Sequence, residues 1–285
     1  MASSFFVVPQ WQGSGSSRAM QLVEGATAIS GDLPASMTVA VPVPLGAGSE
    51  LGSGVRRLSA IEAVTAELRR ALATADRVPI VVGGDCGVEL AAISHAANRH
   101  KLAVVWFDAH ADLNTPQTSP SGAFHGMVLR TLLGDGPTVL LPETPLDPAR
   151  VILAGTRALD AEEQDYIAGS GIRSLAPEEL TPGTLAAALR DSGAEAVYLH
   201  IDLDVLDPGE FGALGFPEPF GISVAGLIDL IQEAKEALPL VGAGLTEFAP
   251  RSPEQAEDEL PTILRIIGAL SSDRSPREAS PTIEA

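Results

Sequence analysis

The chain has 285 residues and a formal net charge of −19, from 37 acidic and 18 basic residues. This excess of negative charge argues against nucleic acid and anionic membranes as partners and favours cationic ligands or metal ions. Hydrophobic residues make up 45% of the sequence, enough for a full core, and the length suits one large α/β domain.

The single cysteine, Cys86, excludes an intrachain disulfide framework. The N-terminal apolar run 5–9 is too short for a signal peptide, and no apolar run approaches the roughly 20 residues of a membrane helix. We therefore expect a soluble cytoplasmic protein that has no membrane partner.

Short apolar runs alternate with helical patterns along the chain. The runs that predict strands are 5–9, 37–43, 78–82, 102–108, 151–154, 171–175, 196–203 and 240–248. The patterns that predict helices are 18–29, 58–73, 88–98, 125–133, 160–168, 181–191, 223–237 and 254–270, the last with a kink or break at Pro261. This alternation predicts one three-layer α/β domain, in which about eight mostly parallel strands are covered by helices on both faces. The domain should span residues 1–273, and the polar segment 274–285 should be a mobile tail.

The segment 104–112 begins as a buried strand and ends with Asp108, His110 and Asp112 at alternate positions. Alternate side chains of extended backbone point to the same side, so these three side chains converge. A solvated turn is the alternative, but an apolar strand delivers the string, and burying two acids without a cation is costly. Carboxylates together with imidazole suit a hard or borderline divalent ion such as Mn²⁺.

The segment 197–204 repeats this arrangement with Asp202 and Asp204. Five such ligands are too many for one mononuclear catalytic site, and they suit two ions that are bridged by carboxylates and activate a water. In parallel sheets, ligands gather outside the carboxyl ends of the strands, where Cys86 and Glu247 also fall. The sequence therefore predicts a two-ion centre at this edge of the sheet.

Five stretches together carry a specific resemblance. They are Gly83-Gly84-Asp85-Cys86, Asp108-Ala-His-Ala-Asp112-Leu-Asn114-Thr-Pro116, Ser121-Gly-Ala-Phe-His125-Gly126, His200-Ile-Asp202-Leu-Asp204-Val-Leu-Asp207-Pro208 and Thr246-Glu247-Phe-Ala-Pro250. In this order they resemble the motifs of the arginase–agmatinase (ureohydrolase) family, which hydrolyses guanidino groups at a two-manganese site. The resemblance implies an arginase-like fold, a small guanidino substrate and two Mn²⁺ per chain.

The resemblance also assigns a role to each of the ligands. Asp108 and Asp202 match the carboxylates that bridge both ions. Asp112 matches a ligand of the first ion, whereas His110 and Asp204 match ligands of the second.

Two further residues match the reacting groups of the family. His125 resembles the histidine that shuttles a proton to the leaving amine, a role that suits the near-neutral pKa of imidazole. Glu247 resembles the carboxylate that grips the guanidinium through paired N–H donors. A solvated loop histidine and an exposed strand-end acid are the alternatives. His200, just before Asp202, is expected to support the ligands rather than to bind an ion.

The amino-acid end of the substrate has its own set of matching residues. Asn114 and Ser121 match positions that the family uses for the α-carboxylate, but Ala123 stands where arginine-specific members have asparagine. A later loop resembles the one whose acids approach the α-amino group, and we assign Asp160 and Glu163 to that role.

Cys86 stands where the family has a histidine ligand of the first ion. A thiolate can still ligate, although it is softer than Mn²⁺ prefers; a buried, inert thiol is the alternative. In this respect the chain resembles the Nω-hydroxy-L-arginine hydrolase of the cycloserine antibiotic pathway, which yields ornithine and hydroxyurea.

We therefore predict hydroxyarginine as the substrate. The alternatives are arginine, agmatine or another guanidino acid, and an inactive metal-binding relative. The short polar C-terminal tail has no apolar anchor, which favours a monomer.

Overall fold

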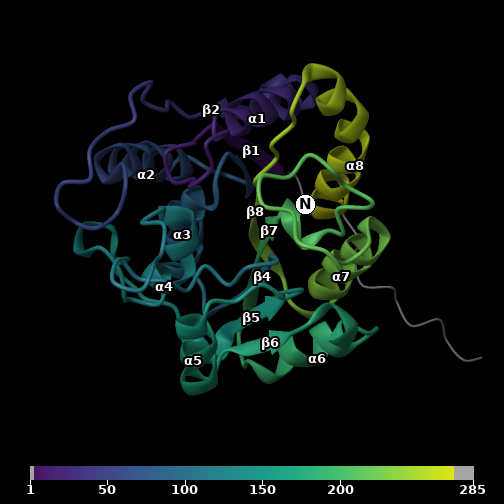
Figure 1. The fold of residues 1–285 in the computed structure, drawn as a ribbon. Helices are drawn as coiled ribbons and strands as arrows, with labels where there is room; N and C mark the ends of the chain where they lie inside the picture. Colours follow the sequence, from purple (N-terminus) through teal and green to yellow (C-terminus); the bar gives the residue numbers. More distant parts are fainter. Residues whose placement is uncertain (1–2, 273–285) are drawn as a thin grey trace, which may run out of the picture.

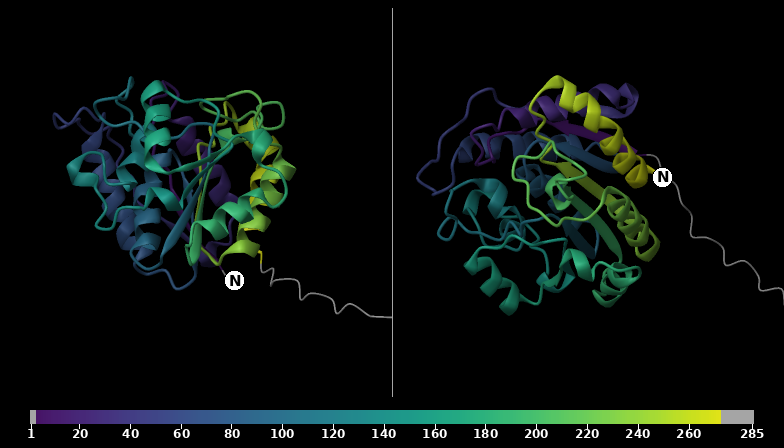
Figure 2. Two further views of the ribbon diagram at one scale, coloured as in Figure 1. Left: turned by 90° about the horizontal axis from the view of Figure 1, so that it is seen from below. Right: turned by 45° about the vertical axis from the view of Figure 1, so that its right-hand side comes forward.

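The computed structural model describes residues 3–272 (Figure 1). The domain end predicted at residue 273 and the tail predicted for 274–285 lie outside the described residues. Within the described part, one sheet is covered by helices on both of its faces (Figure 2).

The strands of the sheet are β1 Ser3–Val8, β2 Thr38–Ala40, β3 Val78–Gly83, β4 Leu102–Phe107, β5 Val151–Ala154, β6 Arg173–Leu175, β7 Ala196–Asp202 and β8 Leu240–Thr246. All neighbours pair in parallel, in the order β2-β1-β3-β8-β7-β4-β5-β6. Every residue of β4 is buried, because helices cover both faces, and this explains its continuous apolar run. The predicted eight-stranded α/β fold is confirmed, and its sheet is parallel throughout rather than mostly.

The α-helices within residues 3–272 are α1 Gln21–Asp32, α2 Leu58–Leu72, α3 Glu89–Ala97, α4 Val128–Leu132, α5 Ala161–Ser170, α6 Thr184–Asp191, α7 Val224–Ala237 and α8 Pro253–Ser271. Apolar side chains of α1, α6, α7 and α8 pack on one face of the sheet, and those of α2, α3 and α4 pack on the other (Figure 1). None of these helices combines the length and apolarity that a membrane span requires.

Two helices differ in detail from their predictions. The helix predicted for 125–133 begins as a 3₁₀ turn, Phe124–Met127, and then continues as α4. A kink or break was predicted at Pro261. The prediction of a break is wrong, because α8 continues through this residue. Pro261 and Glu257 are both exposed, so the Glu257 carbonyl, which lacks the donor that a proline nitrogen cannot supply, faces a side of the helix that water can reach.

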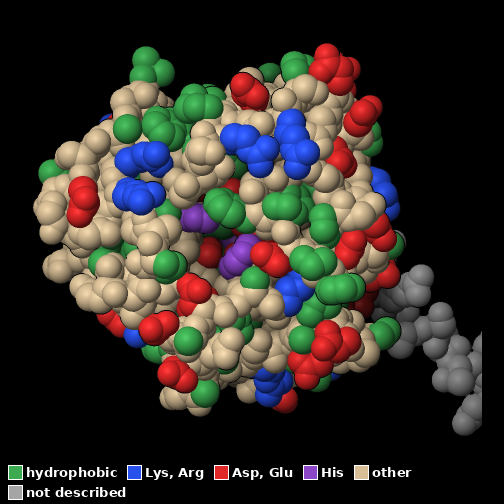
Figure 3. All heavy atoms as spheres, viewed as in Figure 1, with side chains coloured by type: hydrophobic (Ala, Val, Ile, Leu, Met, Phe, Trp, Pro, Cys, Tyr) green, Lys and Arg blue, Asp and Glu red, His purple; other side chains and the backbone are tan. Residues whose placement is uncertain are grey.

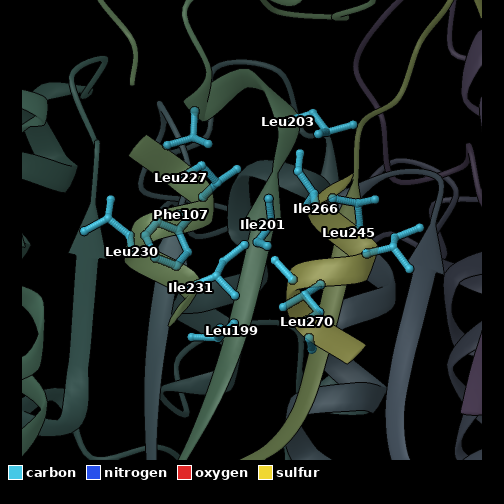
Figure 4. Close-up of a cluster of buried hydrophobic side chains, with 14 of the residues drawn as sticks. Phe107, Leu199, Ile201, Leu203, Leu227, Leu230, Ile231, Leu245, Ile266 and Leu270 are labelled. Carbon is cyan, nitrogen blue, oxygen red and sulfur yellow. The ribbon is translucent and has the colours of Figure 1, made fainter. Parts of the chain in front are cut away.

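Side chains of β7 alternate between the two faces of the sheet. Leu199 and Ile201 join the apolar cluster against α7 and α8 (Figure 4). Tyr198 belongs to the cluster on the opposite face, where α2 and α3 pack. His200 and Asp202 share the parity of Tyr198, so the strand delivers its polar side chains to that second face.

The apolar layer beneath α7 should tolerate truncation poorly. Ile231 is fully buried in this layer (Figure 4), so Ile231→Ala should lower the free energy of unfolding by about 2–5 kcal/mol, from lost burial and an unfilled cavity. Glu236→Ala, on an exposed position of the same helix, should stay within about 0.5 kcal/mol of the parent. Denaturant melts of both variants measure this, and equal losses would contradict the assignment of Ile231 to the core.

Candidate metal centre

The carboxyl ends of β4 and β7 bring the two aspartate motifs together. The strands pair with Phe107 opposite Ile201, so Asp108 and Asp202, the next residue on each strand, emerge side by side. Asp204 lies in a 3₁₀ turn that starts immediately after β7. One pair of neighbouring strands thus brings together two motifs that are almost a hundred residues apart in the sequence.

Backbone N–H groups fix the orientation of these carboxylates. Asp202 Oδ1 accepts a hydrogen bond from the Asp204 N–H at 2.8 Å. Asp204 Oδ1 accepts one from the Ala109 N–H at 3.0 Å, and its other oxygen lies 3.0 Å from His110 Nδ1. His110 Nδ1 also lies 3.5 Å from Asp108 Oδ1. The contacts of the Asp204 carboxylate with Ala109 and His110 therefore connect the tight turn after β7 to the one after β4.

Cys86 lies inside the same cluster. Its Sγ donates to Asp202 Oδ2 at 3.1 Å and lies 3.4 Å from Thr246 Oγ1. In the part of the chain that the structure describes, three groups of side chains have ligand atoms close enough together to hold a metal ion: Cys86 with Asp108 and His200, Cys86 with Asp202 and Glu247, and Asp108 with His110 and Asp204. Asp112 is outside these three groups but lines the same pocket.

The electrostatics of the cluster favour bound cations. Burial, and then neighbouring negative charges, raise the pKa values of Asp112, Asp202 and Glu247 well above their usual ranges. Burial also opposes ionisation of Asp108, yet contacts with histidine side chains hold its pKa below the usual range. Asp112 Oδ2 and both carboxylate oxygens of Glu247 are buried and have no hydrogen-bond partner within residues 3–272. This donor set fits hard or borderline divalent ions, which would neutralise the charges and use the free oxygens.

Two of these acids occupy unusual backbone conformations. Asp112 has φ 52° and Glu247 has φ 64°, in the left-handed region that non-glycine residues rarely adopt. The Glu247 N–H is fixed by the carbonyl of Gly84 at 2.8 Å, and the Asp112 carbonyl accepts from the Arg130 N–H at 3.1 Å. Such conformations cost on the order of 1–3 kcal/mol and cluster at functional sites, which fits two carboxylates aimed at one centre.

Asp85 connects the Cys86 turn to the N-terminal loop. Its buried carboxylate accepts hydrogen bonds from Gln10 Nε2, the Gly13 N–H and the Gly87 N–H. Burial raises the pKa of Asp85 to about 6, although these three donors act against the rise. The Gly87 contact lies within the turn that Asp85 occupies, and the contacts with Gln10 and Gly13 join this turn to the N-terminal loop.

A pocket of about 160 Å³ opens over the cluster, and histidine and acidic side chains lie in a hollow on this face (Figure 3). It is lined by His110, Asp112, Asn114, Ser119, Pro120, Ser121, His125, Gly126, Asp160, Glu163, Asp202, Asp204 and Phe216. The pocket is therefore lined by His110 and Asp112 of the first motif, both aspartates of the second, the predicted proton shuttle and all four predicted substrate-binding residues.

His125 sits between Glu247 and an aromatic wall. Its Nδ1 lies 3.8 Å from Glu247 Oε1, and its ring stacks on Phe216 with centroids 5.1 Å apart. Burial, and then the positive charge of His110, lower the pKa of His125 to about 4. Its imidazole is therefore neutral at pH 7. Sequence reasoning missed Phe216, because only the path of the loop after β7 brings this residue to the pocket.

The predicted substrate-binding residues meet at the pocket wall. Asn114 Nδ2 donates to Asp160 Oδ2 at 2.9 Å. Glu163 is fully engaged, since its two oxygens accept from the N–H groups of Leu113 and Asp160. Ser121 Oγ accepts from the N–H of Ala123 at 3.1 Å. Asp160 and Asn114 therefore offer the pocket a linked acid and amide, whereas Glu163 caps the start of α5.

Sequence comparison places the chain among known proteins. Residues 16–268 match the sequence model of the Arginase family. Arginase of Bacillus caldovelox is 30% identical over 226 residues, which are 73% of this chain and 76% of that protein. Arginase of Staphylococcus aureus strain MRSA252 is 35% identical over 178 residues; this match covers 57% of this chain and spans only 58% of the S. aureus protein.

Solved structures agree with this placement. Entamoeba histolytica arginase in complex with L-ornithine superposes with a TM-score of 0.83 at 26% identity, covering 94% of this chain and 98% of that one. Proclavaminate amidino hydrolase from Streptomyces clavuligerus shares the fold, with a TM-score of 0.72 at 23% identity over 95% of this chain and 92% of that one. Because the family match takes in nearly all of the described residues, the chain belongs to the arginase family.

Proposed function

We propose that this protein hydrolyses a guanidino carbon–nitrogen bond, and that its substrate is Nω-hydroxy-L-arginine, which yields L-ornithine and hydroxyurea. The observation that carries the proposal is the pocket lined by neutral His125 and buried aspartates, with Glu247, whose oxygens have no hydrogen-bond partner among the described residues, 3.8 Å from the His125 ring nitrogen. Family membership supports the reaction class.

The residues that would hold two Mn²⁺ are Cys86, Asp108, His110, Asp112, Asp202 and Asp204. When bound, the ions supply positive charge that neutralises these acids and lowers the pKa of a water beside the guanidino carbon. The proposal of two ions rests on the number of converging carboxylates and on their unused oxygens.

Glu247 suits the recognition of the guanidino group. It is buried, and neither of its oxygens has a hydrogen-bond partner among the described residues. Two carboxylate oxygens match two parallel N–H donors of a guanidinium or hydroxyguanidine, which makes the contact directional as well as attractive. A substrate held in this way lies next to His125, whose Nδ1 is 3.8 Å from Glu247 Oε1.

His125 then moves the proton that the reaction needs. As the water oxygen bonds to the guanidino carbon, neutral His125 accepts a proton, and it returns this proton to the δ nitrogen as the bond to that nitrogen breaks. The amine of ornithine and hydroxyurea are the two products. Phe216 covers one face of the imidazole and limits the access of bulk water to it.

The other end of the pocket suits an α-amino acid. Asp160 provides a carboxylate for the α-amino group, and Asn114 and Ser121 provide polar groups for the α-carboxylate. Ala123, at 1% exposure, offers no polar atom from its side chain here. The contacts to the α-carboxylate of the substrate therefore come from fewer side chains than in arginine-specific members of the family, which have asparagine at the position of Ala123.

Cys86 is the feature that favours the hydroxylated substrate. A thiolate among the ligands donates more charge than imidazole and reduces the Lewis acidity of the centre. An N-hydroxyguanidine is less basic than a guanidine and is the better electrophile when neutral, so a weaker centre suffices. Arginine is the second candidate, because the relatives from B. caldovelox and E. histolytica are arginases.

We also propose that the protein acts as a cytoplasmic monomer. The large apolar side chains that are exposed within residues 3–272 come from separate loops, from strand β2 and from a 3₁₀ turn rather than from one face of an element: Met20, Val39, Leu45, Leu51, Val139 and Phe220. Light scattering on the purified protein would measure its mass directly.

Comparison of substrates tests the proposed reaction. Protein reconstituted with Mn²⁺ should turn over Nω-hydroxy-L-arginine with a kcat/KM at least about tenfold above that for arginine, roughly 1.4 kcal/mol in transition-state binding. The assay separates urea from hydroxyurea and includes agmatine. A clearly higher kcat/KM for arginine would refute the proposed substrate. Fewer than about one bound ion per chain, without turnover, would favour an inactive relative.

Replacement of His125 tests the proton shuttle. His125→Asn should lower kcat by about 10²- to 10⁴-fold, because the leaving nitrogen loses its proton donor, while the number of bound Mn²⁺ ions stays the same. His100→Asn is the matched control, since His100 is exposed and does not line the pocket. Steady-state kinetics with metal analysis of both variants provides the measurement. Unchanged kcat in the His125 variant would exclude the role.

Removal of metal should make the stability of the protein depend on pH, because the charges of the buried acids then lack compensation. The folded pKa values of Asp112, Asp202 and Glu247 are raised, so the metal-free folded protein binds more protons than the unfolded chain above about pH 4 and loses stability as pH rises. Bound cations cancel this loss. The Tm difference between Mn²⁺-loaded and chelator-treated protein should therefore widen from about pH 5.5 to about pH 8. A difference that stays constant at fixed ionic strength would speak against this account.

A further inference from the structure

A second group of buried polar side chains lies behind the candidate metal centre, outside the pocket. Glu89 starts α3 and is 0% exposed, and neither of its carboxylate oxygens has a hydrogen-bond partner among the described residues. An ionisable neighbour on β7 is His200, whose Nδ1 lies 3.9 Å from Glu89 Oε2. Burial of a carboxylate without a partner is costly, so this arrangement requires an explanation.

The sheet is built to leave space for this group. In β8, Gly242 and Gly244 lie opposite Tyr198 and His200 of β7. A Cβ atom on Gly244 would lie only 1.6 Å from Glu89 Oε1, and one on Gly242 would lie 2.7 Å from the ring of Tyr198. Glycine within a strand is destabilising by roughly 0.5–1 kcal/mol relative to alanine. Accommodation of Glu89 and Tyr198 therefore has a measurable cost to the sheet.

His200 connects Glu89 to the proposed ligands. Opposite the Nδ1 that faces Glu89, its Nε2 lies 3.8 Å from Asp108 Oδ2 and 3.9 Å from Cys86 Sγ. The ring is fixed by Trp106, whose centroid is 3.7 Å away. Trp106 itself donates its indole N–H to Asp108 Oδ2 at 3.0 Å. One imidazole thus spans the distance between a buried carboxylate and two side chains of the centre.

We propose that Glu89 is a positioning residue for the metal centre: through His200 it holds Cys86 and Asp108 in place from behind. This inference rests on the proposed metal centre. Outer partners of metal ligands typically change metal affinity by 10- to 100-fold when they are removed. Glu89 does not line the pocket, so its loss changes metal affinity and kcat but leaves the KM of the guanidino substrate unchanged.

A purely structural role is the competing explanation. Glu89 lies in the first turn of α3, where a negative charge stabilises the helix dipole by typically 0.3–1 kcal/mol. Glu24 also lies in the first turn of its helix, α1, but is exposed and does not line the pocket over the centre. If the dipole alone matters, loss of either charge should lower stability a little and should leave metal binding unchanged.

Mn²⁺ titration of the metal-free protein separates the two roles without an activity assay. Glu89→Gln should weaken Mn²⁺ binding by about 10- to 100-fold in calorimetry, whereas Glu24→Gln should leave it unchanged. Ser94→Ala is a second control, since Ser94 is buried in the same helix and bonds only to the Leu90 carbonyl. Ser94→Ala should lower Tm without an effect on Mn²⁺ affinity.

A rescue variant makes the test specific to the carboxylate. Because a side chain at Gly244 would enter the space of the Glu89 carboxylate, Gly244→Asp in a Glu89→Ala background should return an acid to His200 and restore Mn²⁺ affinity. This double variant also applies if Glu89→Gln folds poorly. Wild-type affinity in Glu89→Gln, or no recovery in a folded double variant, would overturn the positioning role. Metal binding without turnover of any guanidino compound would instead refute the proposed function alone.

Discussion

The fold depends on one electrostatic constraint, the burial of several acids at a single edge of the sheet. Asp108, Asp112, Asp202, Asp204 and Glu247 are all at most 4% exposed. Burial of such a cluster is costly unless backbone donors, bound protons or bound cations compensate its charge. The tight turns after β4 and β7, and the left-handed conformations at Asp112 and Glu247, all place carboxylate oxygens where cations can reach them.

Strand order explains how distant segments meet this constraint. In the sheet, β3, β8, β7 and β4 are consecutive neighbours, and each of them ends at a residue of the centre or just before one. Cys86 follows β3, Glu247 follows β8, Asp202 ends β7 and Asp108 follows β4. The strands are parallel, so all four side chains emerge at one edge. The strand order therefore brings these four residues together at the ends of neighbouring strands.

The same logic shows what the sequence predicts and what it does not. Apolar runs and their polar ends locate the strands and the candidate ligands Asp108 and Asp202, because both follow from local periodicity. Phe216 and Glu89 could not be located in this way. The place of Phe216 depends on the path of an irregular loop, and that of Glu89 depends on the packing of α3 against β8, where Gly244 leaves space. Such contacts have no local signal.

The buried group behind the centre also bears on the exchange of histidine for Cys86. A histidine ligand is oriented through its second ring nitrogen, which donates to an outer partner. A cysteine has one sulfur and offers no second donor, so neighbours of that sulfur must set its position. Asp202, Thr246 and His200 surround Cys86 Sγ at 3.1, 3.4 and 3.9 Å. Of these three, His200 faces the buried Glu89 through its other ring nitrogen, so under the proposed role the orienting carboxylate would act on a neighbour of the thiol rather than on Cys86 itself.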